Sequence, residues 1–69
     1  MPIIQISLVA GRPEEAVQHC IREVARTVSR TLHAPLSSVR VMVNEVPPTR
    51  FAVGDTLKSE PPVPAIPQT

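Results

Sequence analysis

The sequence predicts an α+β subunit: one βαβ unit, then a short C-terminal hairpin or loop, assembled with other subunits into an oligomer. Two stretches of alternating apolar residues, 3–9 and 39–46, flank a stretch in which apolar residues recur every three or four positions. Alternation is typical of strands, and the longer spacing is typical of an amphipathic helix. The chain has 69 residues, and a domain of this size buries only about 60% of its unfolded surface. It therefore needs additional stabilisation.

The first predicted strand covers residues 3–9 (IIQISLV), which are rich in β-branched side chains. One face is fully apolar and the other mixes apolar with polar residues. A break at residues 10–12 ends the strand. Pro13 then suits the first position of a helix, where a missing N–H costs nothing.

The predicted helix runs from residue 14 to about residue 32, and Pro35 lies just beyond its end, as a stop signal should. Its apolar positions fall on one face. They are Val17, Cys20, Ile21, Val24, Ala25, Val28 and Leu32. We expect Cys20 to be a small buried apolar side chain, His19 to lie on the helix surface and His33 to lie at the helix end.

The second predicted strand covers residues 39–46 (VRVMVNEV), with alternate valines on one face and Arg40 and Met42 on the other. The two strands should be parallel with a right-handed crossover. After two prolines, residues 49–58 contain a Gly54-Asp55 turn signal that favours a hairpin or loop. We therefore divide the chain into a domain of residues 1–60 and a Pro-rich tail, 61–69, expected to be extended or disordered.

Oligomerisation is the predicted source of the missing stability. The helix covers one face of the sheet, and the other face still presents Ile3, Val9, Met42 and Val46. A two-stranded sheet is not independently stable in water. Cys20 is the only cysteine, so an internal disulfide is impossible, and the cysteine and histidines do not make a metal site. We expect a compact homo-oligomer.

Composition argues against several classes of function. The net charge is +1 with scattered basic residues, and Phe51 is the only aromatic side chain. A nucleic-acid binder would carry a basic stripe and often stacking aromatics. A ribbon-helix-helix DNA binder, the other small fold of strands and helices, needs two helices after one strand.

No apolar run approaches the roughly 20 residues that span a bilayer, and no signal peptide is evident, so we expect a cytoplasmic protein.

Pro2 is the first candidate catalytic residue. Removal of Met1 would leave a secondary amine attached to an apolar strand. An apolar pocket and nearby cations lower the pKa of an amine, and an amine that is neutral near pH 7 is a competent general base. If Met1 is retained, Pro2 is an amide and cannot act as a base. The alternative is that Pro2 only begins an edge strand, and on Pro2 alone this alternative is favoured.

Two arginines occupy positions that packing does not explain. Arg12 precedes the helix start, where the dipole favours anions over cations, so an arginine there suggests an anionic ligand such as a carboxylate. Arg40 lies in a valine-rich strand, on the face expected to meet another subunit. Its anionic partner is either Glu45, in a structural ion pair, or a bound substrate, and the residues alone favour neither.

The segments MPIIQISLVAGR and IREVARTVSRTLHAPLSSVRVMVNEV, with Phe51 downstream, resemble the 4-oxalocrotonate tautomerase family from Pro2 to about Gly54. The resemblance implies βαβ subunits assembled as hexamers, usually trimers of dimers, that need no metal or cofactor. It implies that Pro2 moves a proton between carbons of an enol or dienol acid and its conjugated ketone, and that Arg12 binds a substrate carboxylate. Arg40, from a neighbouring subunit, would polarise the keto oxygen. Phe51 would form part of the apolar wall around Pro2.

Two alternatives to a tautomerase remain. A lyase or dehalogenase on the same scaffold is the enzymatic one, although the haloacrylate dehalogenase branch uses an arginine where this chain has Val9 and an acid near Val53. The other is a non-catalytic subunit of a mixed oligomer. The joint presence of Pro2, Arg12 and Arg40 argues against it, because packing alone requires none of them. The Pro-rich tail departs from better-known members and leaves the subunit contacts and pocket closure at that end open. Pro47-Pro48 departs from the ring-cleavage tautomerases and leaves the physiological substrate open.

Overall fold

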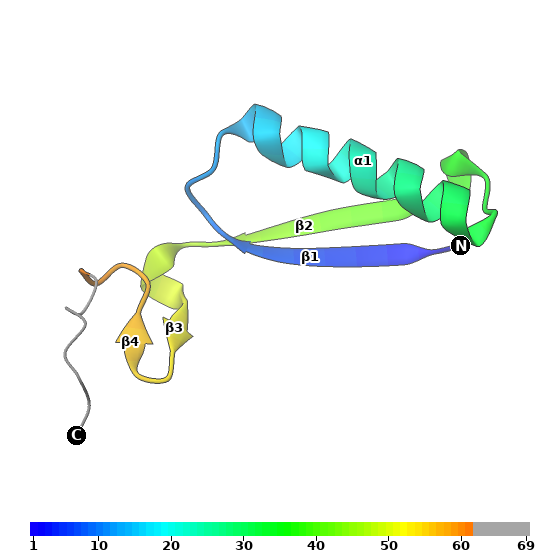
Figure 1. The fold of residues 1–69 in the computed structure, drawn as a ribbon. Helices are drawn as coiled ribbons and strands as arrows, with labels where there is room; N and C mark the ends of the chain where they lie inside the picture. Colours follow the sequence, from blue (N-terminus) through cyan, green and yellow to red (C-terminus); the bar gives the residue numbers. More distant parts are fainter. Residues whose placement is uncertain (62–69) are drawn as a thin grey trace, which may run out of the picture.

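The computed structural model describes residues 1–61, and its ribbon is drawn in Figure 1. The main elements in chain order are β1 (Ile3–Val9), α1 (Glu14–Leu32), the 3-10 turn η1 (Leu36–Ser38), β2 (Arg40–Val46), the 3-10 turn η2 (Pro48–Arg50), β3 (Ala52–Val53) and β4 (Thr56–Leu57). β1 and β2 pair in parallel, and β3 and β4 form an antiparallel hairpin. The predicted βαβ unit with a C-terminal hairpin is confirmed. Of the predicted tail, residues 62–69 lie outside the described part of the chain.

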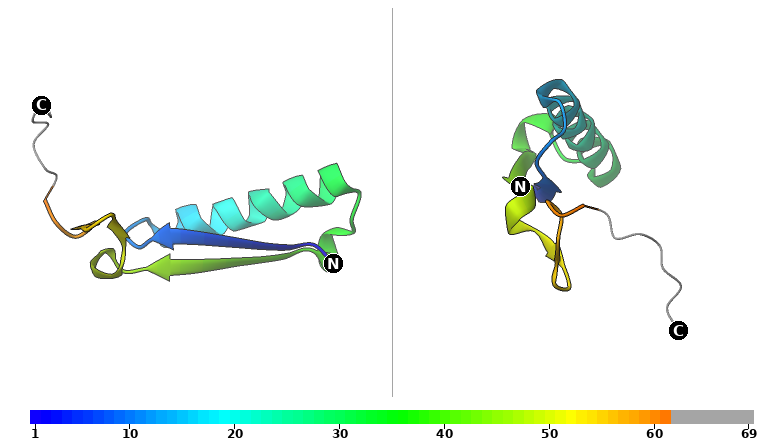
Figure 2. Two further views of the ribbon diagram at one scale, coloured as in Figure 1. Left: turned by 90° about the horizontal axis from the view of Figure 1, so that it is seen from below. Right: turned by 90° about the vertical axis from the view of Figure 1, so that its left-hand side faces the viewer.

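α1 lies along one face of the β1–β2 sheet, and the hairpin projects from the far end of the sheet (Figures 1 and 2). The bounds of β1 and α1 agree with those predicted. β2 begins one residue later than predicted, because the Val39 N–H donates to the Leu36 carbonyl of η1 at 3.1 Å instead of joining the strand ladder. Pro13 lies just before the helix in an extended conformation (φ −58°, ψ 143°), and its carbonyl accepts the N–H groups of Ala16 and Val17.

The end of α1 is set by His33, which adopts the left-handed conformation with φ 54°. The N–H groups of His33 and Ala34 both donate to the Ser29 carbonyl, the first in the last regular bond of the helix and the second in a wider turn that closes it. The Ser29 hydroxyl donates back to the Ala34 carbonyl at 2.6 Å. These bonds turn the chain toward η1 and so fix where β2 starts.

The core of one subunit is thin. Val17, 5% exposed, is the one buried side chain among residues 1–61. The expectation that Cys20 is buried is wrong for the subunit, since the thiol is exposed. Two strands lie only about 5 Å apart, whereas a helix with its side chains is about 10 Å across. The sheet therefore covers a narrow strip of α1 and leaves Cys20 outside it.

The sheet face opposite α1 is open. Ile3 is 60% exposed and Met42 is 47% exposed, as predicted, whereas Val9 and Val46 at the end of the sheet are half-buried. None of the described helices is long and apolar enough to cross a membrane.

Candidate active site

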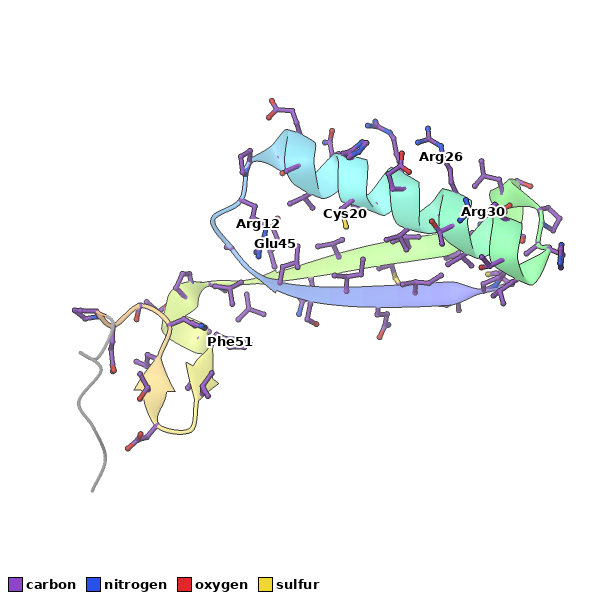
Figure 3. All side chains as sticks on the ribbon, viewed as in Figure 1. Arg12, Cys20, Arg26, Arg30, Glu45 and Phe51 are labelled. Carbon is purple, nitrogen blue, oxygen red and sulfur yellow. The ribbon has the colours of Figure 1, made fainter. Side chains whose placement is uncertain are left out.

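The four predicted site residues lie in two pairs at opposite ends of the sheet. Pro2 and Arg40 lie where β1 and β2 begin, and we call this the Pro2 end. Arg12 and Phe51 lie beyond the points where these strands finish, and we call this the Arg12 end. Figure 3 shows Arg12 and Phe51 at the hairpin side of the molecule, and Figure 1 marks the N-terminus at the other side.

The residues of the Pro2 end are positioned by the parallel register of β1 and β2. Ile3 pairs with Arg40, and the Arg40 backbone N–H donates to the Pro2 carbonyl at 2.9 Å. This bond holds the backbone of Pro2 in line with the sheet while the residue remains half-buried. Met1 is 77% exposed, so its removal would cost the subunit little packing.

The Arg40 side chain is exposed and has no carboxylate partner within the described residues. Its guanidinium donates to the Ser37 carbonyl at 2.8 Å and to the Val39 carbonyl at 3.4 Å. Glu45 lies five positions along the same strand, so the two side chains leave opposite faces of the sheet. The hypothesis of an Arg40–Glu45 ion pair is therefore wrong for the subunit.

The position of Arg12 is determined by the backbone of the residues before it. The Ala10 N–H donates to the Val46 carbonyl at 2.8 Å and extends the sheet by one bond. Gly11 then turns the chain with φ 136°, a conformation that L side chains rarely adopt. Arg12 follows directly, exposed, with one hydrogen bond of 3.4 Å from its guanidinium to the Val9 carbonyl.

An open pocket of about 410 Å³ occupies the Arg12 end. Its lining residues are Ser7, Leu8, Val9, Ala10, Gly11, Arg12, Phe51 and Lys58. Glu45 is drawn near Arg12 in Figure 3, yet the one ion pair within residues 1–61 joins Arg26 to Glu23 on α1 at 2.9 Å. The guanidinium of Arg12 therefore has donors available for an anionic ligand.

The two ends are too far apart to serve one small substrate within a subunit. β1 has seven residues, and a strand rises about 3.3 Å per residue, so the ends are separated by about 20 Å. The structure thus brings Pro2 to Arg40 and Arg12 to Phe51, but does not bring the two pairs together.

Lys58 is the pocket residue that the sequence did not identify. Ala52 pairs with Leu57 in the hairpin, which makes Phe51 and Lys58 the next opposed residues, and the Lys58 N–H donates to the Phe51 carbonyl at 2.8 Å. The Gly54-Asp55 turn signal is compatible with a hairpin or a loop, and only a hairpin places Lys58 opposite Phe51. No group of three or more His, Cys, Asp or Glu side chains in the described residues is placed to hold a metal ion.

The family profile described as "Tautomerase enzyme" matches residues 2–60. The chain belongs to the tautomerase family. It is 48% identical over 54 residues to 2-hydroxymuconate tautomerase from Stutzerimonas stutzeri, a match that covers 78% of this chain and 86% of the relative. The resemblance found in the sequence is confirmed, and the chain is a 4-oxalocrotonate tautomerase-like enzyme.

Solved structures support the same fold. A crystal structure of a 4-oxalocrotonate tautomerase homologue superposes with a TM-score of 0.83 at 32% identity, covering 91% of this tautomerase and all of the homologue. A heterohexameric 4-oxalocrotonate tautomerase from Chloroflexus aurantiacus J-10-fl has a TM-score of 0.81 at 30% identity, covering 87% of this chain and 97% of that one.

Proposed function

We propose that this tautomerase interconverts the enol or dienol and keto forms of a small carboxylate substrate, without a cofactor and with the Pro2 amine as general base. The observation that carries the proposal is the position of Pro2 at the start of β1, half-buried and joined to Arg40 by a 2.9 Å backbone hydrogen bond. Once Met1 is removed, this position presents a half-buried secondary amine on the strand pair that also carries Arg40. Partial burial and positive charge both lower the pKa of an amine, which favours the neutral form that accepts a proton.

The enzyme gains and loses the same proton, so it is unchanged at the end of the reaction. Pro2 accepts a proton from one position of the substrate and returns it to another, so that only the double bonds move. Negative charge develops on the keto oxygen between the two transfers. An Arg40 guanidinium, from the same or a neighbouring subunit, stabilises that charge because a preorganised cation needs no reorganisation as the charge appears.

Arg12 and Phe51 would complete the site from another subunit. Because they lie about 20 Å from their own Pro2, the four residues meet only if the Arg12 end of one subunit packs against the Pro2 end of a neighbour. The open sheet face with Ile3 and Met42 and the thin core both favour such packing. We propose a homohexamer built as a trimer of dimers, in which Arg12 binds the substrate carboxylate and Phe51 keeps water from Pro2.

Retention of Met1 tests the proposed base directly. The protein is prepared with Met1 retained, verified by intact mass, and assayed on 2-hydroxymuconate. We expect turnover to fall by about 10² to 10⁴, the usual contribution of a general base, while the oligomer stays intact. The matched control is the same preparation after methionine aminopeptidase has exposed Pro2, which should recover full activity. Wild-type turnover with Met1 in place would contradict the proposal.

A further inference from the structure

The Arg12 end carries a second cation that the proposed reaction does not use. Lys58 lines the same open pocket as Arg12 and Phe51. The 2.8 Å hydrogen bond from its N–H to the Phe51 carbonyl fixes its backbone beside the pocket's aromatic wall. The position of Lys58 opposite Phe51 follows from the register of the β3–β4 hairpin.

Among residues 1–61, no acidic side chain lines this pocket. Arg12 and Lys58 are its only charged lining residues, and neither takes part in an ion pair within residues 1–61, where the one such pair is Arg26–Glu23. Two cations that share a pocket without an acid between them repel each other, and a bound anion relieves that repulsion. The pocket is therefore suited to an anion that contacts both groups.

We propose that Lys58 is a second carboxylate-binding residue, acting with Arg12, and that it makes the enzyme favour substrates with a carboxylate at the end distant from Pro2. The inference rests on the proposed function, in which Arg12 binds a substrate carboxylate, and adds that this carboxylate is the one distant from Pro2. The arginine fork pairs with both carboxylate oxygens, and the lysine ammonium adds a compact point charge with rotatable donors. A substrate with an apolar distal end gains nothing from Lys58.

Substrate preference tests the role of Lys58. Lys58→Met removes the charge and shortens the unbranched side chain by only one atom. We expect kcat/KM for 2-hydroxymuconate, a dicarboxylate, to fall on the order of tenfold through KM, the size of one charge-assisted hydrogen bond at a partly exposed site. Activity on phenylenolpyruvate, whose distal end is a phenyl ring, should not change. Lys58→Arg should retain the preference, because it retains the charge.

Arg22→Met is the matched control, since it removes one positive charge from an exposed position of α1 outside the pocket. It should leave the ratio of kcat/KM for the two substrates at the wild-type value. An equal loss on both substrates in Lys58→Met, or no loss on either, would overturn the proposal.

Binding of adipate, an unreactive six-carbon dicarboxylate, separates this inference from the proposed mechanism. Calorimetry is carried out on the processed protein, on the protein with Met1 retained, and on Lys58→Met. We expect Lys58→Met to bind adipate about tenfold more weakly, whereas retention of Met1 leaves its affinity largely unchanged. Wild-type adipate affinity in Lys58→Met would refute the role of Lys58, whatever the outcome for Pro2.

Discussion

The Pro2 end and the Arg12 end of the subunit are built differently. At the Pro2 end, the pairing of two parallel strands positions the residues, and a backbone hydrogen bond joins Arg40 to Pro2. At the Arg12 end, a glycine turn and a hairpin position them, and the side chains border an open pocket. The first end holds the proposed proton-transfer chemistry, and the second holds groups suited to recognising an anion.

The distance between the two ends means that, under the proposed mechanism, one subunit does not hold a complete site. Pro2, the proposed base, and Arg12, the proposed carboxylate-binding residue, are separated by the length of β1, about 20 Å. A domain with a core as thin as this one needs additional stabilisation, and association with other subunits is one source of it. The same association can join the two ends, so that stability and catalysis depend on one set of contacts.

Arg40→Ala should have the largest effect among the substitutions. We expect kcat to fall by about 10² or more, as when a donor to a developing oxyanion is lost, while KM changes less, because the contact strengthens as enolate charge develops. Steady-state kinetics on 2-hydroxymuconate measures both constants. An unchanged kcat would remove Arg40 from the mechanism.

Arg12→Ala should act on binding instead of turnover. We expect KM to rise by about 10- to 100-fold, since a charged hydrogen-bonding group is lost from the ground state and the transition state alike. Arg12→Lys, which keeps the charge and loses the bidentate fork, should fall between wild type and Arg12→Ala. A fall in kcat with constant KM would show that the roles of the two ends are reversed.

Gly11 and Gly54 provide a matched pair for testing the backbone of the Arg12 end. An added Cβ meets nothing within 4 Å at either position, so any cost is conformational. Gly54, with φ 63°, lies in the region that Asn tolerates, whereas Gly11, with φ 136°, does not. Gly11→Asn should lower the free energy of unfolding by about 1–3 kcal/mol and Gly54→Asn by much less. Equal denaturation midpoints for the two variants would contradict this reading of Gly11.

Phe51→Ala should produce the smallest change, a displacement of the pH profile. If Phe51 shields the Pro2 amine of a neighbour, its loss admits water, stabilises the protonated amine and raises the amine pKa. The acidic limb of kcat/KM then moves to higher pH, by less than about one unit. Val53→Ala, in the exposed part of the hairpin, should leave the limb unchanged. A limb that moves to lower pH in Phe51→Ala would show that the ring does not desolvate the base.

The sequence was sufficient for the main elements because their periodicity is local. It located β1 and α1 correctly, and it missed the start of β2 by one residue because the Val39 N–H is used by η1. Cys20 was misplaced because helical periodicity identifies an apolar face without showing how narrow a sheet covers it. Their unexpected positions suggested Arg12 and Arg40, and the family resemblance implied their roles, but neither showed that a full strand length separates Arg12 from Pro2 in one subunit. Lys58 was missed because it lies opposite Phe51 only in the β3–β4 register, and the amino-acid composition of the segment does not specify that register.

Subunit mixing tests the central claim, that the Pro2 end of one subunit and the Arg12 end of another form one site. Protein with Met1 retained has a blocked Pro2 end, and Arg12→Ala has a damaged Arg12 end, so each alone should be nearly inactive at low substrate concentration. After the two are dissociated, mixed in equal amounts and reassembled, random pairing in a symmetric oligomer makes about a quarter of the sites intact. The account predicts that activity returns to about a quarter of the wild-type value. If each site belonged to a single subunit, mixing would restore no activity, and that result would contradict the account.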